Sequence, residues 1–272
     1  MKVILSRKGF DSKSGGCASP IMPDGTLLSL PIPEDNYDDN CPKYDSIYYK
    51  GMSYEDILKK LPHNVKGPHC HLDPDIRDDI RSKIPNWMPA FGQINSAQGV
   101  LRNRNVGMKN QEDLFLFFGW FKEVEGGADG YYRYKKNAPD LHIIYGYLQI
   151  EKVLESPKDQ NEIAKYEWHP HAIESRLKNK TNALYIPRER LSFNDDFGHG
   201  VLNYSENRVL TMKDNPNRSV WKNIDALKDD NLMSERKNRA EDGGICYPGV
   251  WQELVLKENK RTEDWAKSII RG

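Results

Sequence analysis

Two apolar, aromatic-rich runs constrain the fold of this chain more than any other feature: residues 114–121 and 141–150. Each run contains one glycine followed by a large aromatic residue, Gly119-Trp120 in the first and Gly146-Tyr147 in the second. Short runs of this composition favour strands that are buried on both faces over helices. Glycine inside a strand usually marks a bulge, a bend or a close approach. We therefore predict two adjacent antiparallel strands, bent at these glycines and joined by a long hairpin loop.

The rest of the chain predicts an α+β fold. Its sheet is expected to be mixed, mostly antiparallel and partly closed, with further strands at residues 2–6 and 250–256 and short peripheral helices. A Ser-x-x-Asp pattern at Ser53 predicts the start of one helix, which Pro62 ends. The 272 residues fit one compact domain, residues 1–272, with elaborations. Within it we predict a central β core at residues 90–190 and a mobile insertion in the charged region 225–245.

Charge and composition limit the classes of function. Forty basic and forty acidic residues give a net charge of zero, whereas a protein that coats DNA without sequence preference is normally basic. A nucleic-acid partner would therefore be met through a local patch or a base pocket, or as a free nucleotide. No run approaches the roughly 20 apolar residues that a spanning helix needs, and the N-terminal apolar stretch is too short for a signal peptide, so we expect a cytoplasmic protein. Four scattered cysteines without a Cys-x-x-Cys pair argue against a disulfide scaffold and a cysteine zinc site.

The densest cluster of acid, base and ligand groups is residues 69–75, His-Cys-His-Leu-Asp-Pro-Asp. Two histidines with one residue between them share a face of a strand and suit a metal or proton transfer. Asp73 or Asp75 can act as a general acid or base. The structural alternative is that one of these aspartates caps the following helix, predicted at residues 76–84. The same spacing recurs at His169-Pro170-His171, where the proline predicts an extended backbone from which both rings can reach one side. For any one histidine a structural role is the more common case.

A second group of candidates suits a nucleotide. The segment from Arg7 to Gly16 has a Gly/Ser-rich loop whose backbone N–H groups can bind an anion, although the same composition fits an ordinary turn. Gln93 offers an amide for a base edge. Trp120 and Tyr147 can stack on a base.

Several of these motifs together resemble one family. They are residues 4–11 with 14–16, 19–25, 28–33, 71–75, 91–93, 113–121 and 169–171. The chain resembles the third of the nucleotide modification associated domains, over most of its length. That resemblance implies association with bacterial and phage systems, including defence systems, that make or process modified DNA bases; it implies no particular reaction. A fainter likeness of the glycine-marked strands to PUA-like and EVE-like barrels implies a base-binding barrel, and no residue is assigned from it.

The favoured hypothesis is an enzyme that acts on a modified base or nucleotide in a pocket. The alternatives are a non-catalytic reader of such a base, and a metal-dependent hydrolase that uses His69 and His71 with His169 and His171. The expected partner is a nucleotide or a modified DNA base, without a membrane; no cofactor is named and no metal ligand is assigned. The catalytic candidates are Asp73, His71 and Asp11. The ligand-binding candidates are Arg7, Ser14, Gly15, Gly16, Gln93, Trp120, His142, Tyr147, His169 and His171.

Overall fold

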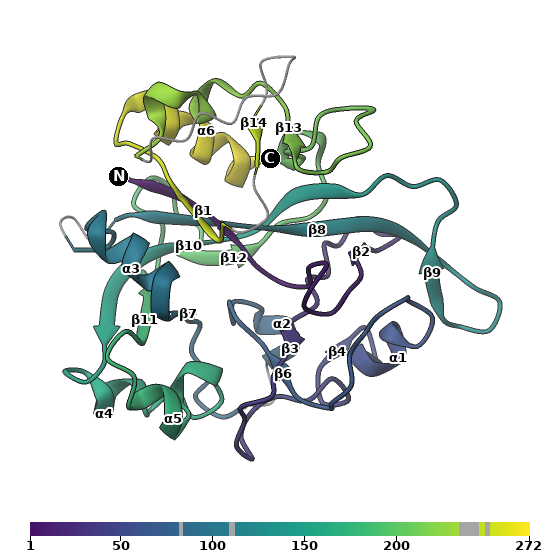
Figure 1. Ribbon diagram of the computed structural model, residues 1–272, viewed down its shortest axis with the longest axis horizontal. Coiled ribbons are helices and arrows are strands. Elements are labelled where there is room, and N and C mark those ends of the chain that lie inside the picture. Colours follow the sequence, from purple (N-terminus) through teal and green to yellow (C-terminus); the bar gives the residue numbers. More distant parts are fainter. Residues whose placement is uncertain (82–83, 109–111, 234–244, 248–250) are drawn as a thin grey trace.

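Two long antiparallel strands form the centre of the sheet in the computed structural model, which describes residues 1–81, 84–108, 112–233, 245–247 and 251–272. They are β8 (Leu114–Gly126) and β10 (Leu141–Glu155), drawn in teal in Figure 1. Leu114 to Phe118 are all fully buried, as expected for strands covered on both faces. The register shifts between Ile144 and Gly146, which confirms an irregularity at the second glycine-aromatic pair.

The N-terminal strand lies parallel to β8 rather than continuing the antiparallel order. β1 (Val3–Arg7) pairs with β8 on one side and antiparallel with β15 (Glu253–Val255) on the other. This arrangement makes the carboxyl end of β1 and the amino end of β15 adjacent, with Ser6 opposite Glu253. Two short strands lengthen the β8 side: β2 (Ser19–Ile21), which is parallel to β8, and β9 (Tyr132–Tyr134), which is antiparallel.

The other edge of β10 curls the sheet into a partly open half-barrel. β12 (His199–Val201) pairs with its middle and β11 (Ala183–Pro187) with its carboxyl end, and β7 (Phe91–Gln93) completes that side. The order β15-β1-β8-β10-β11-β7 confirms the predicted α+β class with a mixed, mostly antiparallel, partly closed sheet. The likeness to PUA-like and EVE-like barrels stays a prediction.

The remaining elements are short. The helices are α1 (Tyr54–Leu58), α2 (Asp78–Arg81), α3 (Asn95–Asn103), α4 (Gln160–Ile163), α5 (Glu174–Leu177) and α6 (Lys260–Arg271). The 3-10 turns are η1 (Pro170–Ala172), η2 (Glu206–Arg208), η3 (Asp225–Leu227) and η4 (Asp229–Asn231). The small strand pairs are β3 (Ile32–Pro33) with β6 (Cys70–His71), β4 (Tyr48–Tyr49) with β5 (Met52–Ser53), and β13 (Val220–Trp221) with β14 (Ile245–Cys246). Ser53 caps α1 as predicted, because its hydroxyl accepts from the Asp56 N–H.

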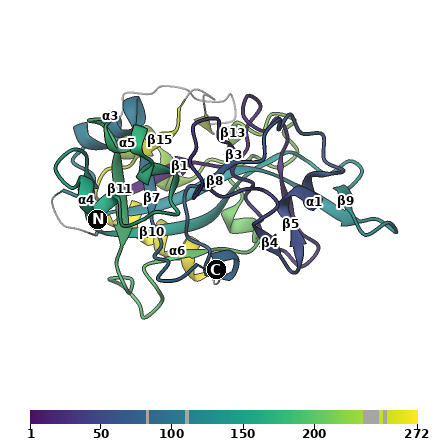
Figure 2. The same cartoon turned by 90° about the horizontal axis from the view of Figure 1, so that it is seen from below.

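Chain segments from opposite ends cover the two faces of the sheet (Figure 1). The C-terminal segment with α6 packs on one face, where Ala266 and Ile269 join a cluster with Val3, Leu116 and Trp221. The segment with β3, β6, α1 and α2 lies below the other face. Figure 2 shows that α1, β4 and β5 lie toward the β9 end, whereas α4 and β11 lie at the opposite end.

Two predictions depend on residues that are only partly described. The charged region 225–245 contains η3 and η4, but residues 234–244 lie outside the described residues, so the predicted mobile insertion stays a prediction. The predicted helix at 76–84 is observed only as α2, with residues 82–83 outside the description. Among the described helices, none combines the length and the apolarity required to cross a membrane.

Candidate functional site

A cavity of about 1000 Å³ opens where the end of β1, β6, β7, η1 and the start of β15 meet. Most of the residues that line it are polar, and charged side chains of both signs are present. The lining residues used below are Arg7, Lys8, Asp11, Lys13, Ser14, Glu34, His71, Asp73, Gln93, His142, His171, Arg176, Arg218 and Glu253. This volume lies at the upper end of the range usual for ligand pockets, and a nucleotide fits within it.

β6 and the residues after it carry His71 and Asp73 into the cavity. The pairing of β6 with β3 places His71 opposite Ile32, and the chain then leaves the strand at Leu72. The Asp73 carboxylate is buried, and its Oδ1 accepts a 2.6 Å hydrogen bond from the backbone N–H of Gly92 in β7. Asp73 therefore joins two segments of the chain, and does not cap α2.

The second histidine pair reaches the same place from the other side of the cavity. His169 is the N-cap of η1, and its Nδ1 accepts from the backbone N–H of His171. Proline at the first position suits a helical turn, so the backbone around Pro170 is a 3-10 turn and not the extended segment that the His-Pro-His spacing predicts. His169 Nε2 lies 3.4 Å from Asp73 Oδ1. The ring centroids of His71 and His171 are 5.3 Å apart.

Hydrogen bonds fix how both cavity histidines point. Nδ1 of His71 lies 2.7 Å from Oε2 of Glu34, and Nδ1 of His171 lies 2.7 Å from Oδ1 of Asn182. Asn182 also donates through Nδ2 to the His171 carbonyl, so its Oδ1 is the atom that faces the ring. Each Nδ1 therefore donates a proton, and each Nε2 is left as the acceptor nitrogen.

Burial determines the charge state of the cluster. It lowers the pKa of His71 despite the hydrogen bond to Glu34, and it lowers the pKa of His171 well below the usual value. Burial would raise the pKa of Asp73, but His169 and the positive Lys8 outweigh it and hold this pKa below its usual value. Near neutral pH the cluster therefore combines two neutral imidazoles with an ionised carboxylate.

A second buried carboxylate lies beside this cluster. Glu253 Oε1 accepts hydrogen bonds from Ser6 Oγ at 2.9 Å and from Gln93 Nε2 at 2.6 Å. Lys8 Nζ lies 3.9 Å from this oxygen, 3.8 Å from Asp73 Oδ2 and 4.3 Å above the Phe91 ring. Burial raises the pKa of Glu253, against the opposing effect of Lys8. Its buried Oε2 has no hydrogen-bond partner among the described residues.

Cationic side chains border the more exposed end of the cavity. The Arg218 guanidinium stacks 3.9 Å from the Trp120 ring centroid and donates to Ser12 Oγ. Arg7 lies 3.7 Å from Asp11, and the exposed Lys13 follows in the same loop. The first turn of α3 also lines the cavity.

Comparison with known proteins identifies the family. The family model described as nucleotide modification associated domain 3 matches residues 2–263. The chain belongs to this family. No curated protein and no solved structure matches the chain. The matched range of the nucleotide modification associated domain includes every residue that lines the cavity.

Most of the candidates from the sequence lie at this cavity of the domain. Those that line it are Arg7, Asp11, Ser14, His71, Asp73, Gln93, His142 and His171. His169 lies beside them, with Nε2 3.4 Å from Asp73 Oδ1. Asp11 is engaged locally, because its Oδ1 accepts from the backbone of Lys13 and Ser14. Gly15 and Gly16 adopt positive φ in this same turn, and a Cβ at Gly15 would overlap the Phe10 ring, so their glycines have a structural explanation.

Three further candidate residues have surroundings that differ from those predicted. Within the described part of the chain, Trp120 and Tyr147 are not among the residues that line the cavity: Arg218 covers the Trp120 ring, and the Tyr147 hydroxyl donates to the Phe197 carbonyl. The ring of His69 stacks on Tyr37, with centroids 3.6 Å apart. Of the four histidines in the hydrolase hypothesis, His71 and His171 form a group with Asp73, whose donor atoms lie within 4.8 Å of one another.

Sequence reasoning overlooked several residues of the site: Glu34, Arg176, Asn182, Arg218 and Glu253. Glu253 had a usable signal, because it is an acidic residue inside the apolar run of the last strand. Such a residue is costly to bury without a partner and commonly marks a site. Glu34, Arg176 and Asn182 stand in polar segments, where nothing in the local pattern distinguishes them from surface residues.

Proposed function

We propose that this domain is an enzyme that modifies a nucleotide, or a single base presented from a nucleic-acid strand, in the cavity. One observation carries the proposal: the partly buried His71 and the buried Asp73 and His171 converge in a cavity that is large enough for a nucleotide and is bordered at its outer end by cationic side chains. Buried ionisable groups that meet in a large pocket are the usual mark of an active site. The family supports a substrate related to nucleotides.

The outer end of the cavity suits a phosphate group. Arg218 presents a guanidinium that stacks on Trp120, and Arg7 and Lys13 also line the cavity. Five cationic side chains line the cavity with four carboxylates, from Asp11, Glu34, Asp73 and Glu253. This near balance favours one nucleotide or one extruded base over binding along a duplex, which needs many cationic contacts.

The inner end suits a base. Glu253 lines the cavity, and its Oε2 has no hydrogen-bond partner among the described residues, so it can accept a hydrogen bond from an exocyclic or ring N–H of a base. His142 belongs to the outer end instead, because it pairs across the sheet with Trp120, and the Trp221 indole donates to its Nδ1 at 3.0 Å. With the phosphate at Arg218 and the base near Glu253, the reacting atoms lie beside His71, Asp73 and His171.

Mass spectrometry of nucleosides and nucleotides tests this function. The purified protein is incubated with ordinary DNA, hypermodified phage DNA and free deoxynucleotides, each with and without divalent metal. We expect one species to be consumed with a new mass, and the rate to fall by about 10²–10⁴-fold in Asp73→Asn, the range typical of an acid–base or ligand group. Retention of one species without a mass change would contradict an enzyme and support a reader. A protein that shows no turnover and retains no species would overturn both the enzyme and the reader.

A matched pair of arginine variants tests the orientation of the substrate. Arg218→Ala removes the guanidinium at the outer end, and we expect KM for a phosphorylated substrate to rise by about tenfold with a smaller change in kcat. Arg133→Ala is the control, because Arg133 is ion-paired to Asp129 near β9, away from the cavity lining. Equal KM values in the two variants would contradict a phosphate site at Arg218.

A further inference from the structure

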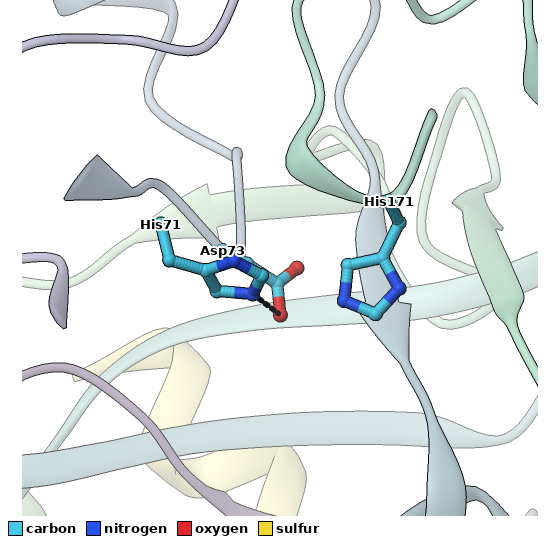
Figure 3. Close-up of side chains that lie close together, drawn as sticks. All are labelled: His71, Asp73 and His171. Atoms are coloured by element: carbon cyan, nitrogen blue, oxygen red, sulfur yellow. Dashed lines mark ion pairs between the residues drawn. The ribbon is translucent and has the colours of Figure 1, made fainter. Parts of the chain in front are cut away.

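Three side chains from distant parts of the sequence present donor atoms to one point (Figure 3). His71 and Asp73 come from β6 and its following turn, and His171 comes from η1. One donor atom of each lies within 4.8 Å of the other two, and His71 Nε2 is 3.9 Å from Asp73 Oδ2. In Figure 3 the carboxylate lies between the two imidazole rings.

The ring protons of His71 and His171 are directed away from the place where the three donor atoms meet. The Nδ1–H groups of both histidines are engaged by Glu34 and Asn182, so the two Nε2 atoms and the carboxylate oxygen approach one another as acceptors. Acceptors repel each other when no proton or cation lies between them. Histidines that bind metals typically have the other nitrogen held by a carboxylate or carbonyl oxygen in this way.

The orientation of Asp73 also leaves one of its carboxylate oxygens without a short hydrogen bond. Its Oδ1 accepts from the Gly92 N–H and faces His169 Nε2. Because His169 Nδ1 accepts from the His171 backbone, the proton of His169 is on Nε2, which lies 3.4 Å from Asp73 Oδ1. Both contacts involve Oδ1, which leaves Oδ2 3.9 Å from His71 Nε2.

Two cationic side chains lie close to the cluster, but neither makes a short hydrogen bond to its acceptor atoms. Lys8 Nζ is 3.8 Å from Asp73 Oδ2, beyond hydrogen-bond distance. Arg176 Nη1 is 3.5 Å from His171 Nε2, at the outer limit of a hydrogen bond, and its Nη2 pairs with Glu34 at 2.6 Å. These charges reduce the affinity for a second cation, but neither forms the short contact that would replace one.

We propose that Nε2 of His71, Nε2 of His171 and Oδ2 of Asp73 bind one divalent first-row transition-metal ion. Two imidazoles and one carboxylate suit zinc, iron(II), cobalt(II) or manganese(II), and suit magnesium or calcium poorly because those ions prefer oxygen ligands throughout. Three protein ligands on one side leave the cavity side to water or substrate, which is typical of catalytic metal sites and not of structural ones. The inference deepens the proposed function and rests on it only for placing the reaction at this end of the cavity.

Metal titration without any nucleotide tests the site. Tag-free full-length protein is stripped with a chelator, shown by circular dichroism to be folded, and titrated with zinc, cobalt(II), manganese(II) and anaerobic iron(II). We expect one ion per chain for at least one metal, and a cobalt(II) visible spectrum typical of nitrogen and oxygen ligands. Folded protein that binds none of the four ions stoichiometrically overturns the proposal.

Variants locate the ion. Asp73→Asn and His171→Gln keep the approximate side-chain shape and are expected to weaken binding by about 100-fold or more, and Asn182→Ala by about 10–100-fold through loss of ring orientation. His69→Gln is the matched control, because His69 stacks on Tyr37 outside the cluster, and its affinity should equal that of the wild type. Arg176→Gln removes the nearby positive charge and should raise the affinity. Equal affinity of the wild type and Asp73→Asn overturns the assignment.

The two proposals fail in different ways. Metal binding without any consumed or retained nucleotide leaves the metal site standing and removes the proposed function. If stripped protein and protein incubated with metal modify a nucleotide at the same rate, and neither binds an ion, the function stands and the metal site is removed.

Discussion

Gly92→Ala tests whether the cluster depends on a close approach of backbone to imidazole. A Cβ at Gly92 would lie 2.2 Å from Cδ2, 2.3 Å from Cγ and 2.7 Å from Nε2 of His171. Favourable contacts between such atoms need about 3.5–4.0 Å, so the ring or the strand has to move by more than an ångström. Gly92 does not adopt positive φ, and glycine is therefore required here for space and not for backbone conformation.

Neither way of moving is free of cost. Displacing the ring breaks the 2.7 Å hydrogen bond from His171 Nδ1 to Asn182, worth about 0.5–1.5 kcal/mol net. Displacing the backbone of β7 instead lengthens the 2.6 Å bond from the Gly92 N–H to Asp73. Overpacking of a filled interior adds about 1–3 kcal/mol. We expect Gly92→Ala to lower the free energy of unfolding by about 2–4 kcal/mol and the metal affinity by about 10–100-fold.

Urea unfolding and metal titration of the same preparation measure both effects. Gly99→Ala is the matched control: Gly99 lies in α3, and a Cβ there would have no heavy atom within 4 Å. That substitution should stabilise the protein by about 0.5–1 kcal/mol through helix propensity. A Gly92→Ala protein as stable as the wild type, with unchanged metal affinity, would refute the reasoning.

Three further predictions concern pH dependence, the core and a helix cap. Burial lowers the pKa of His142 to about 3, so as the pH falls below about 6.5 protons bind the unfolded chain first, and at pH 5 the protein should have lost about 2 kcal/mol of its stability at neutral pH through this group. His142→Asn keeps an acceptor for Trp221 and should lack that loss in urea unfolding, whereas parallel pH profiles of variant and wild type would contradict the prediction. Phe117 is fully buried and contacts Phe91 edge to face at 5.0 Å between centroids, so Phe117→Ala should destabilise the protein by about 3–5 kcal/mol in chemical denaturation; a loss below that of an Ile→Val change would refute its place in the core. Ser53→Ala removes the cap of α1 and should cost about 1 kcal/mol, with no change in nucleotide turnover.

The fold class was predictable from the segments whose local composition indicates their secondary structure and burial. The apolar runs that became β8 and β10 are continuous because both faces of these strands are covered, and a glycine within the second run marked the irregularity near Gly146. The parallel pairing of β1 with β8 was not predictable in the same way. It joins residues far apart in the chain, and a short apolar run carries no information about its partner or its direction.

The site was predictable in its residue types and not in its assembly. His71, Asp73 and His171 stood out because ionisable residues cluster around them in the sequence. Their convergence depends on η1 meeting β6 and β7, and their orientation depends on Glu34 and Asn182, which no local pattern distinguishes. The helix-capping alternative for Asp73 followed from sequence proximity to α2, whereas the carboxylate accepts from Gly92 in β7.

A crystal grown with the metal and a retained nucleotide tests the central claim most directly. Diffraction data collected above and below the metal absorption edge give an anomalous difference map that locates the ion without reference to its ligands. The account predicts one peak between Nε2 of His71, Nε2 of His171 and Oδ2 of Asp73, with the nucleotide in the cavity and its base toward that peak. An ordered cluster without a peak, or a nucleotide bound outside the cavity, would contradict it.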